Sequence, residues 1–169
     1  MDVSPSRPVP DIAGPGQESV WGYPRPPRVE PTGELVQIRL GGVLVVSSNA
    51  ALRVLETSHP PTYYVPIGDF ADGALRRAPG SSWCEFKGFA TYFDVVGGGV
   101  TAPGAAWTYP DPTPGFEAIL DHVAVMPGAM DECRVDDEEV RPQEGGFYGG
   151  WITSRVVGPF KGGPGSRFW

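Results

Sequence analysis

Glycine and proline interrupt this chain so often that regular elements must be short. The sequence holds 24 glycines and 20 prolines in 169 residues, a share that reaches the range of low-complexity chains. Hydrophobic residues nevertheless make up 40% of the sequence, and aromatic residues are spread along it, which argues against general disorder. The length suits one domain with one core. We therefore expect a compact domain of short strands and many turns.

Short apolar runs between turn residues predict a mainly β architecture. Residues 35–40 and 43–46 flank Gly41-Gly42, which is the pattern of a β-hairpin. Further strands are expected at residues 62–66, 82–87, 89–96, 100–109 and 122–126, and a last hairpin at 130–135 and 139–141. Short helices are expected at 50–55, capped by Asn49, and at 114–120, with a helical turn within 69–77.

Changes in composition divide the chain into three parts. Residues 1–17 are rich in Pro, Gly and Ser and predict a flexible arm. Residues 18–141 contain the expected strands and form the β domain. Residues 142–169 are rich in glycine, but large apolar residues such as Trp151 and Phe160 favour a tail that docks on the domain.

The net charge of −7 opposes binding to nucleic acid and to anionic membranes. The first residues lack the apolar segment of a signal peptide, and no run approaches 18 apolar residues. We therefore expect no membrane partner and a cytoplasmic location, with Cys84 and Cys133 as free thiols. The acidic run from Asp136 to Glu139 is interpreted as a solvated turn, and a divalent-cation site is the alternative.

Polar and aromatic residues concentrate in two segments that could form the wall of one site. The first runs from Arg53 to Tyr64 and the second from Trp83 to Gly88. On the expected helix, Arg53 and Glu56 stand at i,i+3 spacing, which predicts a local ion pair. His59 could pair with Glu56 or act as an acid or base.

Three residues are candidates for catalysis: His59, Cys84 and Lys87. Lys87 follows Cys84 by three residues, and a nearby ammonium favours the reactive thiolate, with His59 as its base. The alternative is an inert cysteine on a strand. Because each Cys and His is isolated in sequence, we expect no zinc site and no cofactor.

Four groups of residues resemble the bacterial family catalogued as domain of unknown function 427. The matching pieces are Glu18-Ser-Val-Trp21 with Tyr23-Pro-Arg-Pro-Pro27, Arg53-Val-Leu-Glu-Thr-Ser-His59-Pro-Pro61 with Tyr63-Tyr64, Cys84-Glu-Phe-Lys87-Gly88 with Ala90-Thr-Tyr92, and Ala106-Trp107-Thr-Tyr109-Pro110. The resemblance covers roughly residues 18–141.

The resemblance implies a small β domain, β-tent or barrel-like, with a few short helices and extended termini. Relatives with the β-tent shape carry zinc on two CxxC pairs, and this chain has no CxxC. Some collections label the family nucleotidyltransferase-like. Nucleotidyl transfer needs phosphate grips and metal-binding carboxylates, and the chain lacks the P-loop motif, so its residues give that label little support.

The leading hypothesis is a cytoplasmic domain that binds a small, anionic ligand in an aromatic-lined polar pocket. The expected ligand-binding residues are Arg25, Glu56, His59, Tyr63, Lys87, Trp107 and Tyr109. Two alternatives stay open: an enzyme that uses Cys84 or His59, and a protein-interaction module or homodimer formed through the Pro- and Gly-rich ends.

Overall fold

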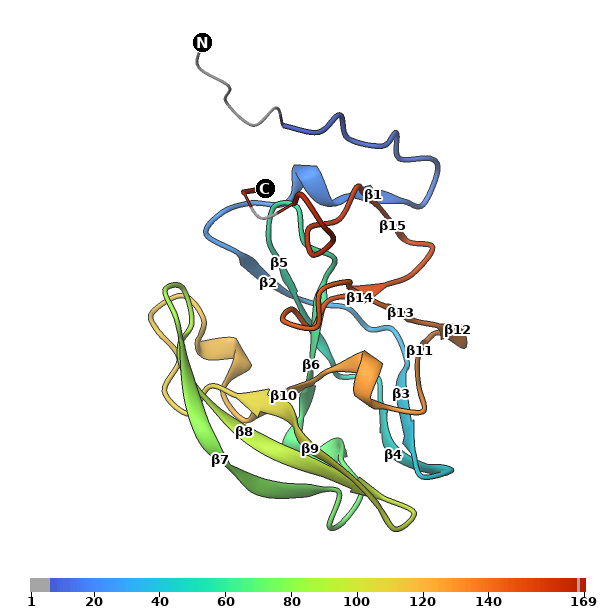
Figure 1. The fold of residues 1–169 in the computed structure, drawn as a ribbon, viewed down its shortest axis with the longest axis vertical. Helices are drawn as coiled ribbons and strands as arrows, with labels where there is room; N and C mark the ends of the chain where they lie inside the picture. Colours follow the sequence, from blue (N-terminus) through green and yellow to red (C-terminus); the bar gives the residue numbers. More distant parts are fainter. Residues whose placement is uncertain (1–6, 167) are drawn as a thin grey trace.

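A seven-stranded antiparallel sheet is the main element of the computed structural model, which describes residues 7–166 and 168–169. The strand order is β2-β5-β6-β10-β9-β8-β7 (Figure 1). The strands are β2 (Arg28–Pro31), β5 (Leu52–Leu55), β6 (Thr62–Pro66), β7 (Leu75–Cys84), β8 (Gly88–Gly97), β9 (Val100–Thr108) and β10 (His122–Val125). Every neighbouring pair is antiparallel.

A second, four-stranded sheet has the order β12-β11-β3-β4. Its strands are β3 (Val36–Leu40), β4 (Val43–Ser48), β11 (Glu132–Val135) and β12 (Glu138–Glu139). Two small pairs complete the fold: β1 (Glu18–Ser19) with β15 (Val156–Val157), and β13 (Arg141–Pro142) with β14 (Trp151–Ile152). Single 3-10 turns are η1 (Val20–Gly22), η2 (Ile67–Asp69), η3 (Glu117–Ile119) and η4 (Pro127–Ala129).

The interior strand β6 is buried on both faces, and its successive side chains point in opposite directions. Tyr63 and Val65 belong to the main core, together with Ile38 and Val46 of the smaller sheet and with Trp151. Tyr64 points the other way, into a second cluster that includes Tyr109, Phe116 and Ile119. The two clusters put apolar layers on both sides of the large sheet.

The first and the last described residues lie at the same end of the molecule (Figure 1). A third cluster joins Val20 and Tyr23 to Leu55, Ile152 and Val156. The ring of Trp169 also lies 5.6 Å from that of Trp21, edge to face. The segments before β2 and after β14 are therefore packed against β5.

The mainly β single domain is confirmed, and its sheets stay open rather than closing into a barrel. The expected hairpins at 35–46 and 130–141 are present. The helix expected at 50–55 is wrong: these residues form β5, because pairing with both β2 and β6 outweighs local propensity. The helix expected at 114–120 shrinks to η3, and the turn expected within 69–77 lies earlier, at η2. In the described residues no helix is long and apolar enough to cross a membrane.

Candidate functional site

The bend between β5 and β6 brings Glu56 and His59 together. Ser58 adopts a φ of 72°, a left-handed conformation that costs a non-glycine residue on the order of 1 kcal/mol. Its N–H donates to the Val20 carbonyl (3.1 Å), and its carbonyl accepts from the Lys161 N–H (2.9 Å). This anchored bend leaves His59 Nε2 3.4 Å from Glu56 Oε2.

Arg25 reaches the same carboxylate from the segment between η1 and β2. Its Nη2 lies 3.1 Å from Glu56 Oε2 and donates to the Thr57 carbonyl at 2.9 Å. Burial alone would raise the pKa of Glu56, but the hydrogen bond from His59 and the charges of His59, Arg25 and Lys87 outweigh it and lower that pKa. Glu56 is therefore an anion surrounded by basic side chains.

His59 has both ring nitrogens engaged. Gln143 donates from Nε2 to the Lys161 carbonyl (2.6 Å) and accepts the Gly150 N–H on Oε1 (3.1 Å). These bonds fix its amide, so Nε2 also faces His59 Nδ1, at 3.4 Å, as a donor. In the neutral ring, this arrangement makes Nδ1 the acceptor and puts the ring proton on Nε2, which faces Glu56. The edge of the Tyr148 ring closes the other side, 4.9 Å between centroids.

A group of aromatic side chains, the aromatic flank, lies next to Lys87. Lys87 Nζ lies 5.6 Å from the ring centroid of Tyr109, within range of a cation–π interaction. Trp107 Nε1 donates to the Tyr64 hydroxyl at 3.3 Å. Burial raises the pKa of both Tyr64 and Tyr109, so their phenols stay neutral. Half-buried Cys84 packs against this cluster. No hydrogen bond or ring contact in the described part of the chain joins Cys84 to His59.

The structure thus brings together Arg25, Glu56 and His59, and Lys87 lies close enough for its charge to lower the pKa of Glu56. Lys87, Tyr109 and Trp107 are linked through Tyr64.

Tyr63 lies on the opposite face of β6 from this group. Its ring stacks on Trp151 with centroids 5.0 Å apart, and its hydroxyl donates to Glu34 at 2.9 Å. The structure therefore places Tyr63 in the main core, away from the other six expected ligand-binding residues.

Arg53 also lies elsewhere, and its expected ion pair with Glu56 is wrong. On a strand, i,i+3 side chains do not face each other, and Arg53 is fully buried against Glu18 (2.9 Å) and Glu30 (2.5 Å). Arg155 extends this network, pairing with Glu18 at 3.2 Å and with Glu34 at 2.9 Å. The network ties β1, β2, β5 and the C-terminal segment together.

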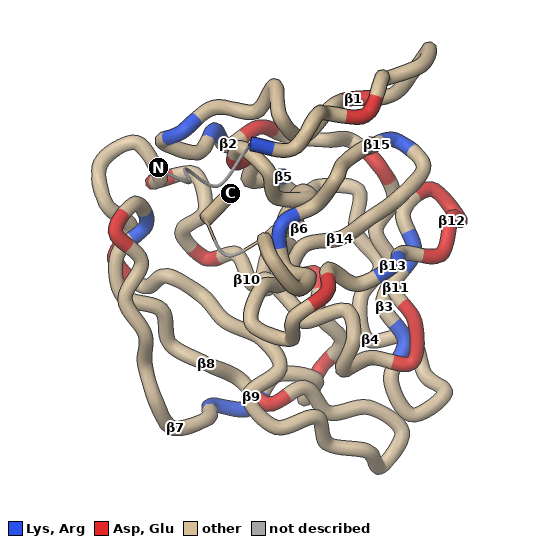
Figure 2. Tube along the Cα trace, turned by 45° about the horizontal axis from the view of Figure 1, so that its top comes forward, with Lys and Arg blue, Asp and Glu red and all other residues tan. Residues whose placement is uncertain are grey.

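The acidic run forms the expected turn between β11 and β12. Asp136 and Asp137 have φ values of 47° and 68°, which suits a tight hairpin turn. Acidic residues follow the β12 edge, with basic residues beside them at β11 and β13 (Figure 2). Among the described residues, no three His, Cys, Asp or Glu side chains gather as metal ligands.

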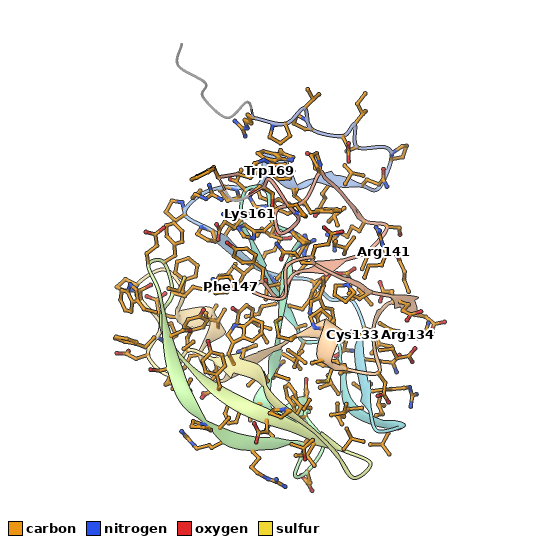
Figure 3. All side chains as sticks on the ribbon, in the orientation of Figure 1. Cys133, Arg134, Arg141, Phe147, Lys161 and Trp169 are labelled. Atoms are coloured by element: carbon orange, nitrogen blue, oxygen red, sulfur yellow. The ribbon has the colours of Figure 1, made fainter. Side chains whose placement is uncertain are left out.

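Two open depressions lie on the surface of the described residues, and neither is lined by Glu56 or His59. One, of about 410 Å³, is lined by Trp83, Gly88, Phe89, Thr91 and residues 110–114. The other, of about 370 Å³, is lined by Gly145, Phe147, Tyr148, Lys161 and residues 162–166. Figure 3 shows Lys161 and Trp169 near the N-terminal segment, with Cys133 and Arg134 on a separate part of the molecule.

Sequence reasoning missed Tyr64, Gln143, Tyr148 and Lys161 as neighbours of the site. The last three come from the C-terminal tail, where the aromatic residues among glycines indicated docking but not its place. Gly149 shows how close the approach is, because a Cβ there would overlap the Trp107 ring.

These features define an open, mainly β domain with a carboxylate–histidine pair at a strained bend, surrounded by basic and aromatic side chains. Residues 28–136 match the family model NTP_transf_9, described as Domain of unknown function (DUF427). This span is more than half of the chain, so the chain belongs to that family. A search of curated proteins finds no match. The family span includes Glu56, His59 and Lys87, whereas Arg25, Gln143 and Tyr148 lie outside it.

Proposed function

We propose that this domain binds a small anionic ligand beside Glu56, between Arg25 and Lys87. The observation that carries the proposal is the convergence of basic side chains from three separate segments on one carboxylate. Arg25 and Lys87 alone supply two positive charges against the single negative charge of Glu56. One positive charge is therefore left for a ligand, in a chain whose net charge is −7.

The aromatic flank gives the ligand its second contact. Half-buried Trp107 offers apolar ring surface. The phenols of Tyr64 and Tyr109 are buried and hydrogen-bonded to each other, so they support this wall rather than contact the ligand. A few directed polar groups on apolar walls are typical of small-molecule sites. The proposed ligand is a carboxylate or phosphate with a compact apolar body. We place the protein in the cytoplasm, and its two free thiols, Cys84 and Cys133, support that location.

Thermal shift measurements with a panel of small carboxylates and phosphates test this proposal. Any anion that stabilises the wild-type chain should lose its effect in Arg25→Ala and in Lys87→Ala. Removing one charged partner weakens binding by about 1.5–3 kcal/mol, which is roughly a tenfold to hundredfold loss of affinity. Arg141→Ala is the control, because Arg141 is exposed on β13. Equal binding by all four proteins would contradict the proposal.

A further inference from the structure

Two large aromatic side chains stand exposed at the tip of the longest hairpin. Trp83 of β7 and Phe89 of β8 are cross-strand partners, and their rings meet edge to face with centroids 4.8 Å apart. They are 61% and 62% exposed. Aromatic residues are enriched in protein–protein interfaces, and exposed apolar patches mark interaction sites. This pair is therefore a candidate contact surface.

The Pro110–Pro114 loop forms the other wall of a groove beside this pair. Prolines at 110, 112 and 114 alternate with Asp111 and Thr113, and the groove holds about 410 Å³. The loop is fixed to the hairpin turn, because the Thr113 N–H donates to the Lys87 carbonyl at 3.2 Å and its hydroxyl donates to the Phe86 carbonyl. The groove is thus formed before any partner arrives.

An aromatic groove with rigid walls suits an extended, proline-containing peptide. Such peptides lose little conformational entropy on binding because proline already restricts their backbone. The chain itself carries such a peptide in residues 7–12, where Pro8 and Pro10 alternate with other residues. Val9 and Ile12 of this arm are 86% and 94% exposed, so its apolar side chains have no cover within the molecule.

The arm of a molecule does not occupy the groove of the same molecule. The Asp11 N–H donates to the Gly158 carbonyl at 2.8 Å, and the Arg7 guanidinium lies 5.0 Å from the centroid of the Trp21 ring system. The arm therefore runs beyond β1 and β15, far from the turn between β7 and β8 (Figure 1), beside which the groove lies.

We propose that the proline-rich arm of one copy docks in the Trp83–Phe89 groove of a second copy. Val9 and the two prolines would pack on the rings. Arg7 would leave Trp21 and pair with Asp111, the acidic residue in the groove wall. A reciprocal exchange fills both grooves of a two-fold dimer. Because each contact is small, the dimer is weak and forms only at high protein concentration.

Sedimentation velocity of the full chain over a wide concentration range tests this proposal. The wild type should move from monomer towards dimer as concentration rises. Trp83→Ala, Phe89→Ala and the double variant Pro8→Ala/Pro10→Ala should all stay monomeric, and none of these positions belongs to the buried core. Phe147→Ala is the matched control, since Phe147 is an exposed aromatic (83%) outside the groove, and it should dimerise like the wild type.

Two outcomes would overturn the proposal. The first is a wild-type chain that stays monomeric at every concentration. The second is a dimer that the groove variants abolish but the arm variant keeps, because the groove would then hold another part of the second copy. Neither outcome bears on ligand binding at Glu56, which uses different residues.

Discussion

Arg53 is buried against charged partners that lie far from it in the sequence. Its guanidinium is fully buried between Glu18 of β1 and Glu30 of β2. Burial would lower the pKa of Arg53, but hydrogen bonds and charge from these carboxylates raise it above its ordinary value. Arg53 therefore stays charged and acts as an electrostatic link between β1, β2 and β5.

Replacing Arg53 should destabilise the fold far more than replacing its neighbour Arg28. Arg53→Met leaves two carboxylates without their central partner, and breaking a buried pair costs about 3–5 kcal/mol. Arg28 pairs with the same Glu30, at 3.6 Å, but from an exposed position, so Arg28→Met should cost about 1 kcal/mol or less. Urea unfolding measures both. Equal losses in the two variants would show that Arg53 is not the link.

Glu18 predicts a pH dependence of stability in the acid range. Burial alone would raise its pKa, but hydrogen bonds from Arg53 and Tyr23 and the charges of Arg53 and Arg155 lower it from 4.5 to about 2. A carboxylate with a lowered pKa stabilises the fold above its unfolded pKa and loses that contribution as pH falls through the folded one. The stabilisation should therefore be complete above about pH 4.5 and disappear towards pH 2.

Thermal unfolding of wild type and Glu18→Gln across this range checks the prediction. The gap in melting temperature should be widest near neutral pH and should narrow below pH 4.5. The exposed substitution Glu139→Gln serves as control and should leave the curve close to that of the wild type. A gap between wild type and Glu18→Gln that is constant with pH would contradict the assigned ion pairs.

Among the elements, the C-terminal tail completes the surroundings of the β5–β6 bend. Gln143 orients His59, Tyr148 covers its ring, and Lys161 holds the bend through the Ser58 carbonyl. Gly149 and Gly150 pass so close to Trp107 and Pro60 that neither position has room for a Cβ. The tail can approach the family domain this closely only because these residues are glycines.

A single methyl group at Gly149 should therefore displace the tail. Gly149→Ala would force its Cβ into the Trp107 ring, so the segment around Phe147 should become more sensitive to chymotrypsin and Trp fluorescence should change. Gly68→Ala is the matched control, since a Cβ there meets nothing within 4 Å. Unchanged proteolysis of Gly149→Ala would show that the tail is not held against Trp107.

The elements also show where sequence reasoning works. The hairpin of β3 and β4 could be predicted because two β-branched runs flank a glycine pair, and all its information is local. Strand β5 could not, because Ala50-Ala51 before it suit a helix, and its pairing with β2 reaches back across the whole β3–β4 hairpin. The i,i+3 spacing of Arg53 and Glu56 predicts an ion pair only on a helix. On strand β5, Arg53 pairs instead with Glu18 and Glu30.

The sequence motifs indicated which polar residues could cluster, but not on which face of a strand each side chain lies. Glu56, His59 and Lys87 do lie near one another, as their clustering in two motifs indicated. Tyr63 and Tyr64 could not be told apart, because β6 is buried on both faces and the register decides which phenol turns towards Trp107. The contributions of Gln143 and Tyr148 depend on where the tail docks, and glycine-rich sequence does not encode that place.

At the scale of the whole molecule, the large sheet and segments from both sides of the family domain converge on the β5–β6 bend. The N-terminal segment supplies Arg25, the family domain supplies Glu56, His59 and Lys87, and the tail supplies Gln143 and Tyr148. The acidic edge at β12 is a separate region of the surface (Figure 2). The central claim is that this convergence is a binding site for a small anion.

Amide NMR spectra, recorded while the most stabilising anion of the panel is titrated into the full chain, test that claim most directly. We predict saturable shifts at residues 56–59, 87, 107–109 and 148, with β3, β4 and the turn at 136–137 unchanged. Shifts confined to the β3–β4 hairpin or to the acidic turn, or no saturable shift with any anion, would contradict it.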